Sequence, residues 1–147
     1  MINKFKRNYL YDYDICQSIG GSIIKNATIK DKGDSEFVQE LQSLGVNRNV
    51  ALVITFLKDQ NERTFMDIEI ATDLKQQKVS VAMQNLREKG WLKEHDIEGN
   101  RRGRRLKIYA LKATIDEIIN YYEMKKNMES ARAMESIQRL KELSSGN

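Results

Sequence analysis

The chain contains no proline and, among its 147 residues, only one cysteine and one histidine. A single cysteine excludes an intrachain disulfide, and one cysteine with one histidine cannot build a zinc site. No apolar run approaches the roughly 20 residues that cross a bilayer, and the first residues lack the apolar segment of a secretory signal. The absence of proline is compatible with long helices. We therefore expect a cytoplasmic protein rich in helix, with no membrane contact and no cofactor.

The small excess of positive charge, +4 over the whole chain, is distributed unevenly. Residues 75–112 carry 11 Lys/Arg against 4 Asp/Glu, a net charge of +7, whereas the remainder of the chain has a net charge of −3. Concentration of positive charge in one segment is typical of a nucleic-acid-binding surface.

Hydrophobic patterning divides the chain into three parts. Residues 1–33 form an N-terminal arm of uncertain structure, which is either partly ordered or supplies further contacts to a partner or to DNA. Residues 34–112 combine helical periodicity with a closing hairpin, and residues 113–147 predict one long C-terminal helix.

Four helices are predicted in residues 34–112, where apolar residues recur three and four positions apart. Asn47 is placed to cap the second helix. Thr64 opens the third, with its hydroxyl accepting from the backbone of Asp67. The fourth helix, residues 76–89, follows after a short turn, so the third and fourth together predict a helix-turn-helix.

The exposed face of residues 76–89 is predicted to carry side chains that can read base edges. Gln and Asn can form two hydrogen bonds with adenine, Lys can bind guanine, Ser can bind either, and an exposed valine can touch a thymine methyl. The candidate DNA-contacting residues of this helix are Gln76, Gln77, Lys78, Ser80, Val81, Gln84 and Asn85. The alternative is an ordinary solvated helix face.

The hairpin that follows favours the DNA interpretation. Gly90 ends the helix, a strand begins at Trp91, and residues 106–111 alternate apolar and polar as a returning strand. The loop between them is crowded with guanidinium groups, which repel one another unless an anion is near. Duplex DNA offers a phosphate every ~1.7 Å of axis, and a narrow minor groove also attracts arginine. The candidate residues are Arg101, Arg102, Arg104, Arg105 and Lys107; the alternative is a solvated basic loop without a partner.

Thr114 is placed to cap the last helix, which is predicted over about residues 115–143. A rod of this length, roughly 45 Å, is too long to bury its apolar residues on one small domain, so we expect it to pair with a second copy. The predicted dimerisation residues are Ile115, Ile118, Tyr122, Met128, Ala131, Ile137 and Leu140.

No catalytic arrangement is recognisable in the sequence. Asp67, Glu69 and Asp73 are explained by helix capping and solvation. Residues 20–22 are not followed by the Lys-Ser/Thr that completes a phosphate-binding loop. We interpret Cys16 as a buried thiol rather than a redox sensor. We therefore expect that the protein is not an enzyme.

The run RTFMDIEIATDLKQQKVSVAMQNLREKGWLKE, followed by GRRLKIYAL, resembles the archaeal predicted transcriptional regulators of the winged-helix class, near the TrmB, MarR and ArsR branches. The resemblance covers roughly residues 44–143 and implies a homodimeric DNA-binding protein with a C-terminal dimerising helix. It also implies that the candidate residues of the fourth helix, from Gln76 to Gln84, face the groove and that residues 101–105 form the wing tip. Arg105 departs from the pattern, because proline is common there.

We therefore predict a mainly α fold with a small β-hairpin, namely a winged helix-turn-helix domain plus a long C-terminal dimerisation helix. The predicted function is sequence-specific binding of double-stranded DNA by a homodimeric transcriptional regulator. The alternative is a winged-helix protein-interaction module of a transcription assembly, without its own operator. The sequence leaves open the operator and whether a small-molecule effector binds between the helices.

Overall fold

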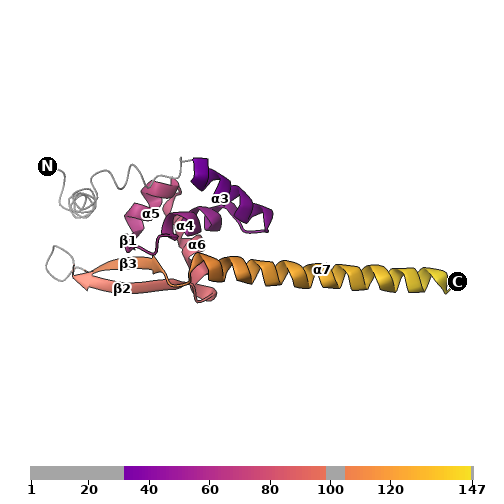
Figure 1. The fold of residues 1–147 in the computed structure, drawn as a ribbon. Helices are drawn as coiled ribbons and strands as arrows, with labels where there is room; N and C mark the ends of the chain where they lie inside the picture. The colour runs from indigo at the N-terminus through magenta and orange to yellow at the C-terminus, as the bar shows by residue number, and fades with distance from the viewer. Residues whose placement is uncertain (1–31, 99–104, 147) are drawn as a thin grey trace. The chain divides into compact units, whose positions relative to one another are not determined.

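The computed structural model describes residues 32–98 and 105–146 (Figure 1). The predictions made for residues 1–31 and for Arg101, Arg102 and Arg104 lie outside these ranges. The described residues divide into two compact units, with the boundary between Ala113 and Thr114.

The first unit contains four helices, α3 (Lys32–Ser43), α4 (Arg48–Leu57), α5 (Phe65–Thr72) and α6 (Gln76–Glu88). Two of them, α4 and α5, begin at a capping side chain. The Asn47 side chain accepts a hydrogen bond from the Asn49 amide (2.9 Å). Thr64 and Asp67 form a reciprocal capping box at the start of α5, with N···O distances of 3.1 Å and 3.0 Å. Both caps are as predicted, because capping depends on residues only a few positions apart.

The turn between α5 and α6 depends on a residue with left-handed backbone conformation. Asp73 has φ +56°, a region that Asp tolerates better than bulkier residues. The next residue, Leu74, lies outside α5 and is half-buried. Gly90, with φ +73°, ends α6 as predicted.

The sheet has three antiparallel strands in the order β1-β3-β2: β1 (Arg63–Thr64), β2 (Leu92–Glu98) and β3 (Arg105–Leu111). The hairpin register places Leu92 opposite Leu111 and Glu98 opposite Arg105. The sequence did not predict β1, since two residues are too few to show an alternating pattern. This short strand pairs with Tyr109 and Ile108, which makes β3 the central strand.

The central position of β3 overturns the predicted alternation of its side chains. All four residues from Ile108 to Leu111 are buried. β3 is paired along both edges, with β1 and β2. It contacts α4 and α5, and the Tyr109 ring lies edge-on to Phe65, with 6.2 Å between ring centroids.

The core of the first unit is built around α4, in which every residue from Val50 to Leu57 is buried. The largest fully buried side chains of this unit come from three helices: Ile54 and Leu57 of α4, Ile68 of α5, and Met83 and Leu86 of α6. Helices and sheet together form a winged helix-turn-helix, in which the β2–β3 hairpin follows α6 directly. The fold is therefore mainly α with a small sheet, as predicted.

The second unit is one helix, α7 (Ile115–Ser145), of 31 residues. It begins with a second capping box, in which Thr114 accepts from the Glu117 amide and the Glu117 carboxylate accepts from the Thr114 amide. Ile118 and Tyr122 are buried, whereas every residue from Glu123 to Gly146 is exposed. Within residues 32–98 and 105–146, no helix has the length and apolarity to span a membrane.

Candidate nucleic-acid interface

The outer face of α6 presents the side chains that the sequence predicted. Gln76, Gln77, Lys78, Ser80, Val81 and Gln84 are exposed, and Asn85 is half-buried. The inner face holds Val79, Ala82, Met83 and Leu86, all fully or almost fully buried. Val81 is 70% exposed although it is apolar. An aliphatic side chain within a polar, solvent-facing surface can make an apolar contact with a partner such as a thymine methyl.

The amino-terminal end of α6 lacks the negative charge that is present at the amino-terminal ends of α5 and α7. The latter two helices each hold a carboxylate at their capping box, which offsets the positive end of the helix dipole. The N-cap of α6 is Lys75, which makes no side-chain capping bond, and the first turn contains no acidic residue. The exposed Lys78 adds further positive charge. This end of α6 is therefore suited to lie near an anion.

The carboxyl-terminal half of α6 is tied to the wing by an ion pair. The Arg87 guanidinium donates to both carboxylate oxygens of Glu94 on β2, at 2.7 Å and 2.9 Å. Its Nη1 also donates to Gln84 Oε1 (2.5 Å), and Gln84 Nε2 donates to Glu88 Oε1 (3.1 Å). The hydrogen bond from Arg87 lowers the pKa of Glu94, and the bond to Glu94 raises the pKa of Arg87. Both shifts favour the charged pair.

Asn85 is the predicted contact residue that lies least favourably for DNA. Its side-chain oxygen accepts a hydrogen bond from Lys89 Nζ (2.9 Å), and Lys89 in turn lies over the Trp91 ring, 5.7 Å from its centroid. Because Asn85 is half-buried, whereas the other predicted contact residues of α6 are exposed, the candidate base-reading surface comprises the exposed residues from Gln76 to Gln84.

The described part of the hairpin is balanced in charge rather than strongly basic. The register sets Asp96 opposite Lys107 and Glu98 opposite Arg105. Directly opposed charges on neighbouring strands attract one another. The charged residues of the two strands are Lys93, Arg105 and Lys107 against Glu94, Asp96 and Glu98. The sequence count of basic residues missed this pairing, which only the register reveals. The excess positive charge of the wing therefore belongs to Arg101, Arg102 and Arg104.

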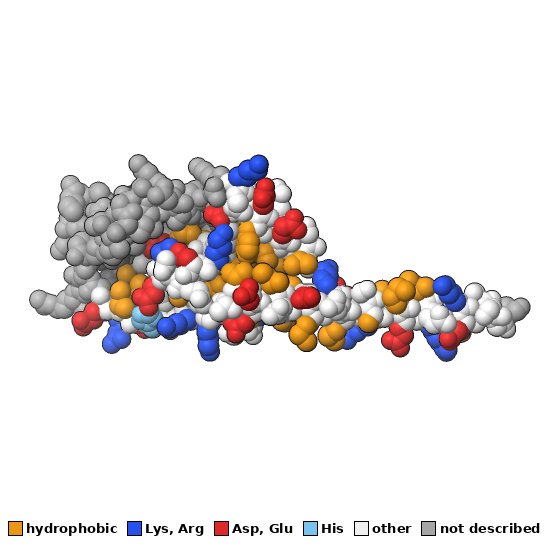
Figure 2. Space-filling view, viewed as in Figure 1, with side chains coloured by type: hydrophobic (Ala, Val, Ile, Leu, Met, Phe, Trp, Pro, Cys, Tyr) orange, Lys and Arg blue, Asp and Glu red, His pale blue; other side chains and the backbone are white. Residues whose placement is uncertain are grey.

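The helix α7 has two separate apolar sectors along its exposed length. At about 100° per residue in an α-helix, Tyr121, Met124, Met128 and Ala131 share one side of the helix, and Ala133, Ile137 and Leu140 share roughly the opposite side. We call these the proximal and distal sectors. Figure 2 shows hydrophobic side chains along the lower edge of α7 in its middle and along its upper edge toward the C-terminal end. Met124 and Leu140 are 66% and 65% exposed.

The predicted dimerisation residues therefore fall into three groups. Ile118 and Tyr122 are buried within the single chain, and Ile115 is half-buried. Met128 and Ala131 lie in the proximal sector, and Ile137 and Leu140 lie in the distal sector.

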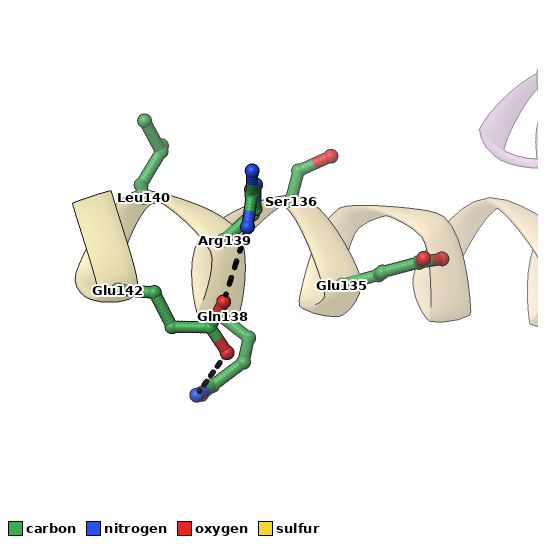
Figure 3. Close-up of a pocket in the computed structure, with 6 residues that line it drawn as sticks. All are labelled: Glu135, Ser136, Gln138, Arg139, Leu140 and Glu142. Carbon is green, nitrogen blue, oxygen red and sulfur yellow. Dashed lines mark hydrogen bonds and ion pairs between the residues drawn. The ribbon is translucent and has the colours of Figure 1, made fainter.

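A hollow beside α7 is lined by Glu135, Ser136, Gln138, Arg139, Leu140 and Glu142 (Figure 3). Gln138 and Arg139 both contact the Glu142 carboxylate, at 3.3 Å and 3.5 Å. Since one helix supplies all six lining residues, the hollow is an open groove and does not enclose a ligand as a typical small-molecule site does. No group of three His, Cys, Asp or Glu side chains within the described ranges could hold a metal ion.

No protein-family model matches the chain, and no curated protein matches it. Among solved structures, the chain is similar to Stf76 from the Sulfolobus islandicus plasmid-virus pSSVx, with 18% sequence identity and a TM-score of 0.40. The match covers 52% of this chain and 96% of that chain. A similarity at this level carries no argument about function. The resemblance to the TrmB, MarR and ArsR branches therefore stays a prediction.

Proposed function

We propose that this protein is a sequence-specific, double-stranded DNA-binding transcriptional regulator that acts as a homodimer. The observation that carries the proposal is the outer face of α6. Gln76, Gln77, Lys78 and Ser80 are exposed there, and their side chains make no hydrogen bond or ion pair with any residue that the structure describes. Polar groups arranged in this way on a helix next to a wing suit the edges of base pairs in a major groove.

In the proposed complex, the amino-terminal half of α6 enters the major groove. Base contacts of helix-turn-helix proteins usually come from this end of the recognition helix. The uncapped N-terminus of α6, with Lys75 and Lys78, lies nearest the phosphates and contributes electrostatic attraction. Val81 contacts a thymine methyl, and the arginines of the wing neutralise backbone phosphates beside the groove.

A second copy of the chain is proposed to cover the distal sector of α7. Large apolar side chains that remain exposed on a helix indicate a partner surface. Ala133, Ile137 and Leu140 recur with the 4-3 spacing of a helix-helix seam, and branched aliphatic side chains are typical of such seams. The methionine-rich proximal sector has a more adaptable surface. A two-fold dimer would bind half-sites about one helical turn, ~34 Å, apart or a multiple of it.

The test is selection of bound duplexes from a random library by the purified protein at moderate salt, followed by affinity measurements on the selected site. We expect a palindromic or near-palindromic site. Gln77→Ala should relax the preference at one base pair of each half-site, because a bidentate amide contact discriminates by roughly 10- to 100-fold. Gln39→Ala is the matched control, since Gln39 is an exposed glutamine on α3 and should leave every preference intact.

Two outcomes would contradict the proposal. If no duplex binds better than random sequence, sequence-specific regulation is wrong. If DNA binding is negligible while the protein binds polymerase subunits directly, the alternative of a protein-interaction module applies, since a fold alone does not determine function.

A further inference from the structure

The side chain of Gln84 is held in one orientation by its neighbours on α6. Arg87 can only donate hydrogen bonds, so the atom of Gln84 that it contacts at 2.5 Å must be the amide oxygen. A carboxylate can only accept, so the atom of Gln84 that lies 3.1 Å from Glu88 must be the amide nitrogen. The two ends of the amide are therefore distinguished by charged partners on either side.

This arrangement leaves Gln84 the capacity for further hydrogen bonds. A primary amide has two N–H groups and two oxygen lone pairs, and the contacts with Arg87 and Glu88 use one of each. One donor and one acceptor remain, which is what a bidentate contact with the N6 and N7 atoms of adenine requires.

The orientation depends on a residue outside α6. Glu94 of β2 binds two nitrogens of Arg87, at 2.7 Å and 2.9 Å, which fixes the plane of the guanidinium and leaves Nη1 directed at Gln84. The Arg87 and Glu94 side chains are 42% and 22% exposed, so the pair lies at the surface where α6 meets the hairpin. The carboxylate also offsets the charge of Arg87, which would otherwise be available to a phosphate.

We propose that Arg87 and Glu94 are positioning residues that orient the Gln84 amide for reading one base pair and thereby couple base recognition to the wing. This inference rests on the proposed function. Glu94→Gln keeps the size of the side chain but removes its charge and one of its two acceptor oxygens, so the guanidinium loses its bidentate partner and with it the fixed orientation that it gives the amide.

The experiment measures the affinity of each variant for the selected duplex and for duplexes in which each base pair is changed in turn. In the unaltered protein, we expect roughly 10- to 100-fold discrimination at the base pair that Gln84 contacts. In Glu94→Gln, we expect most of this discrimination to be lost. Affinity for random duplex should stay the same or rise, with a salt slope steeper by up to about one unit, because Arg87 becomes available to a phosphate.

Asp96→Asn is the matched control. Asp96 lies on the same strand, two residues beyond Glu94 and opposite Lys107, so its substitution removes the same charge without touching the Gln84 contacts. It should leave the base preference unchanged. Gln84→Ala should abolish discrimination at the same base pair, and adding Glu94→Gln to it should cause no further loss there, because both changes act through one amide.

Separate outcomes identify which idea fails. If the unaltered protein prefers no sequence, the proposed function fails and the inference falls with it. If it has a preference that Gln84→Ala relaxes but Glu94→Gln leaves intact, positioning by Glu94 is wrong while the function stands. If Gln84→Ala leaves every preference unchanged, Gln84 reads no base. Should Glu94→Gln fail to fold, as judged by circular dichroism, Arg87→Lys provides the same test, since lysine lacks the planar fork.

Discussion

The dimer proposed for α7 can be tested by the double substitution Ile137→Ala/Leu140→Ala in the distal sector. Alanine keeps the helix, because it has the highest helix propensity, and removes only the apolar surface. The two side chains are 45% and 65% exposed in the single chain. At roughly 2 kcal/mol for the full burial of a large aliphatic side chain, covering these fractions contributes about 2 kcal/mol per protomer.

A symmetric dimer contains this surface twice, so the total contribution is about 4 kcal/mol. Since about 1.4 kcal/mol corresponds to a factor of ten, the double variant should raise the dimer dissociation constant by about three orders of magnitude. Sedimentation equilibrium over a wide concentration range measures this constant directly. The double variant should also bind the selected duplex with lower affinity and without cooperativity between the two half-sites.

The matched control is Met124→Ala/Met128→Ala in the proximal sector, where the two side chains are 66% and 56% exposed. This variant removes a similar apolar area from the other side of α7 and should leave the dissociation constant within a few-fold of the original. If the control disrupts the dimer and the distal variant does not, the wrong sector was assigned. If neither variant changes self-association, α7 is not the dimer interface.

Three further predictions concern the capping box, the ion pair and the wing. Thr64→Ala should lower the free energy of unfolding by about 1 kcal/mol in urea titrations, and an unchanged midpoint would show that the cap contributes nothing. The Glu94 pKa is lowered in the folded state by its bond to Arg87, so the pair stabilises the fold at neutral pH. That stabilisation should be lost as the pH falls below about 4. In Glu94→Gln, the free energy of unfolding should therefore change less with pH in this range. A pH dependence identical to that of the unaltered protein would show that the ion pair does not stabilise the fold. The double substitution Arg102→Ala/Arg104→Ala should weaken binding to all duplexes. The dependence of affinity on salt concentration should become shallower by about one unit of slope per lost phosphate contact. A loss of affinity confined to one sequence would mean that these arginines read bases.

The elements that the sequence predicted correctly depend on residues close together along the chain. Asn47, Thr64 and Thr114 each cap a helix through a partner two or three residues away, and Gly90 supplies a left-handed backbone at the end of α6. These interactions are decided within a few residues of the chain, so composition and spacing are sufficient to locate them. The buried and exposed faces of α6 follow for the same reason from its 3.6-residue period.

The sequence did not predict the features that depend on residues far apart along the chain. The strand β1 exists only because Arg63 and Thr64 meet β3, more than 40 residues later in the chain. The same pairing makes β3 central. Tyr109, which an alternating pattern had predicted to be exposed, is buried and packs against Phe65 of α5. The balance of charge on the hairpin depends on the register that sets Asp96 against Lys107, and a count of basic residues contains no register.

For the candidate site, the sequence alone determined which side chains α6 offers, because helical periodicity and the amide-rich composition require no knowledge of the fold. Only the tertiary structure decided which residue holds the Arg87 guanidinium beside Gln84. Bringing β2 beside α6 places Glu94 on Arg87 and so positions the guanidinium that contacts Gln84. The reason is physical: capping and periodicity are local energies, whereas ion pairs and burial depend on which distant segments the folded chain brings into contact.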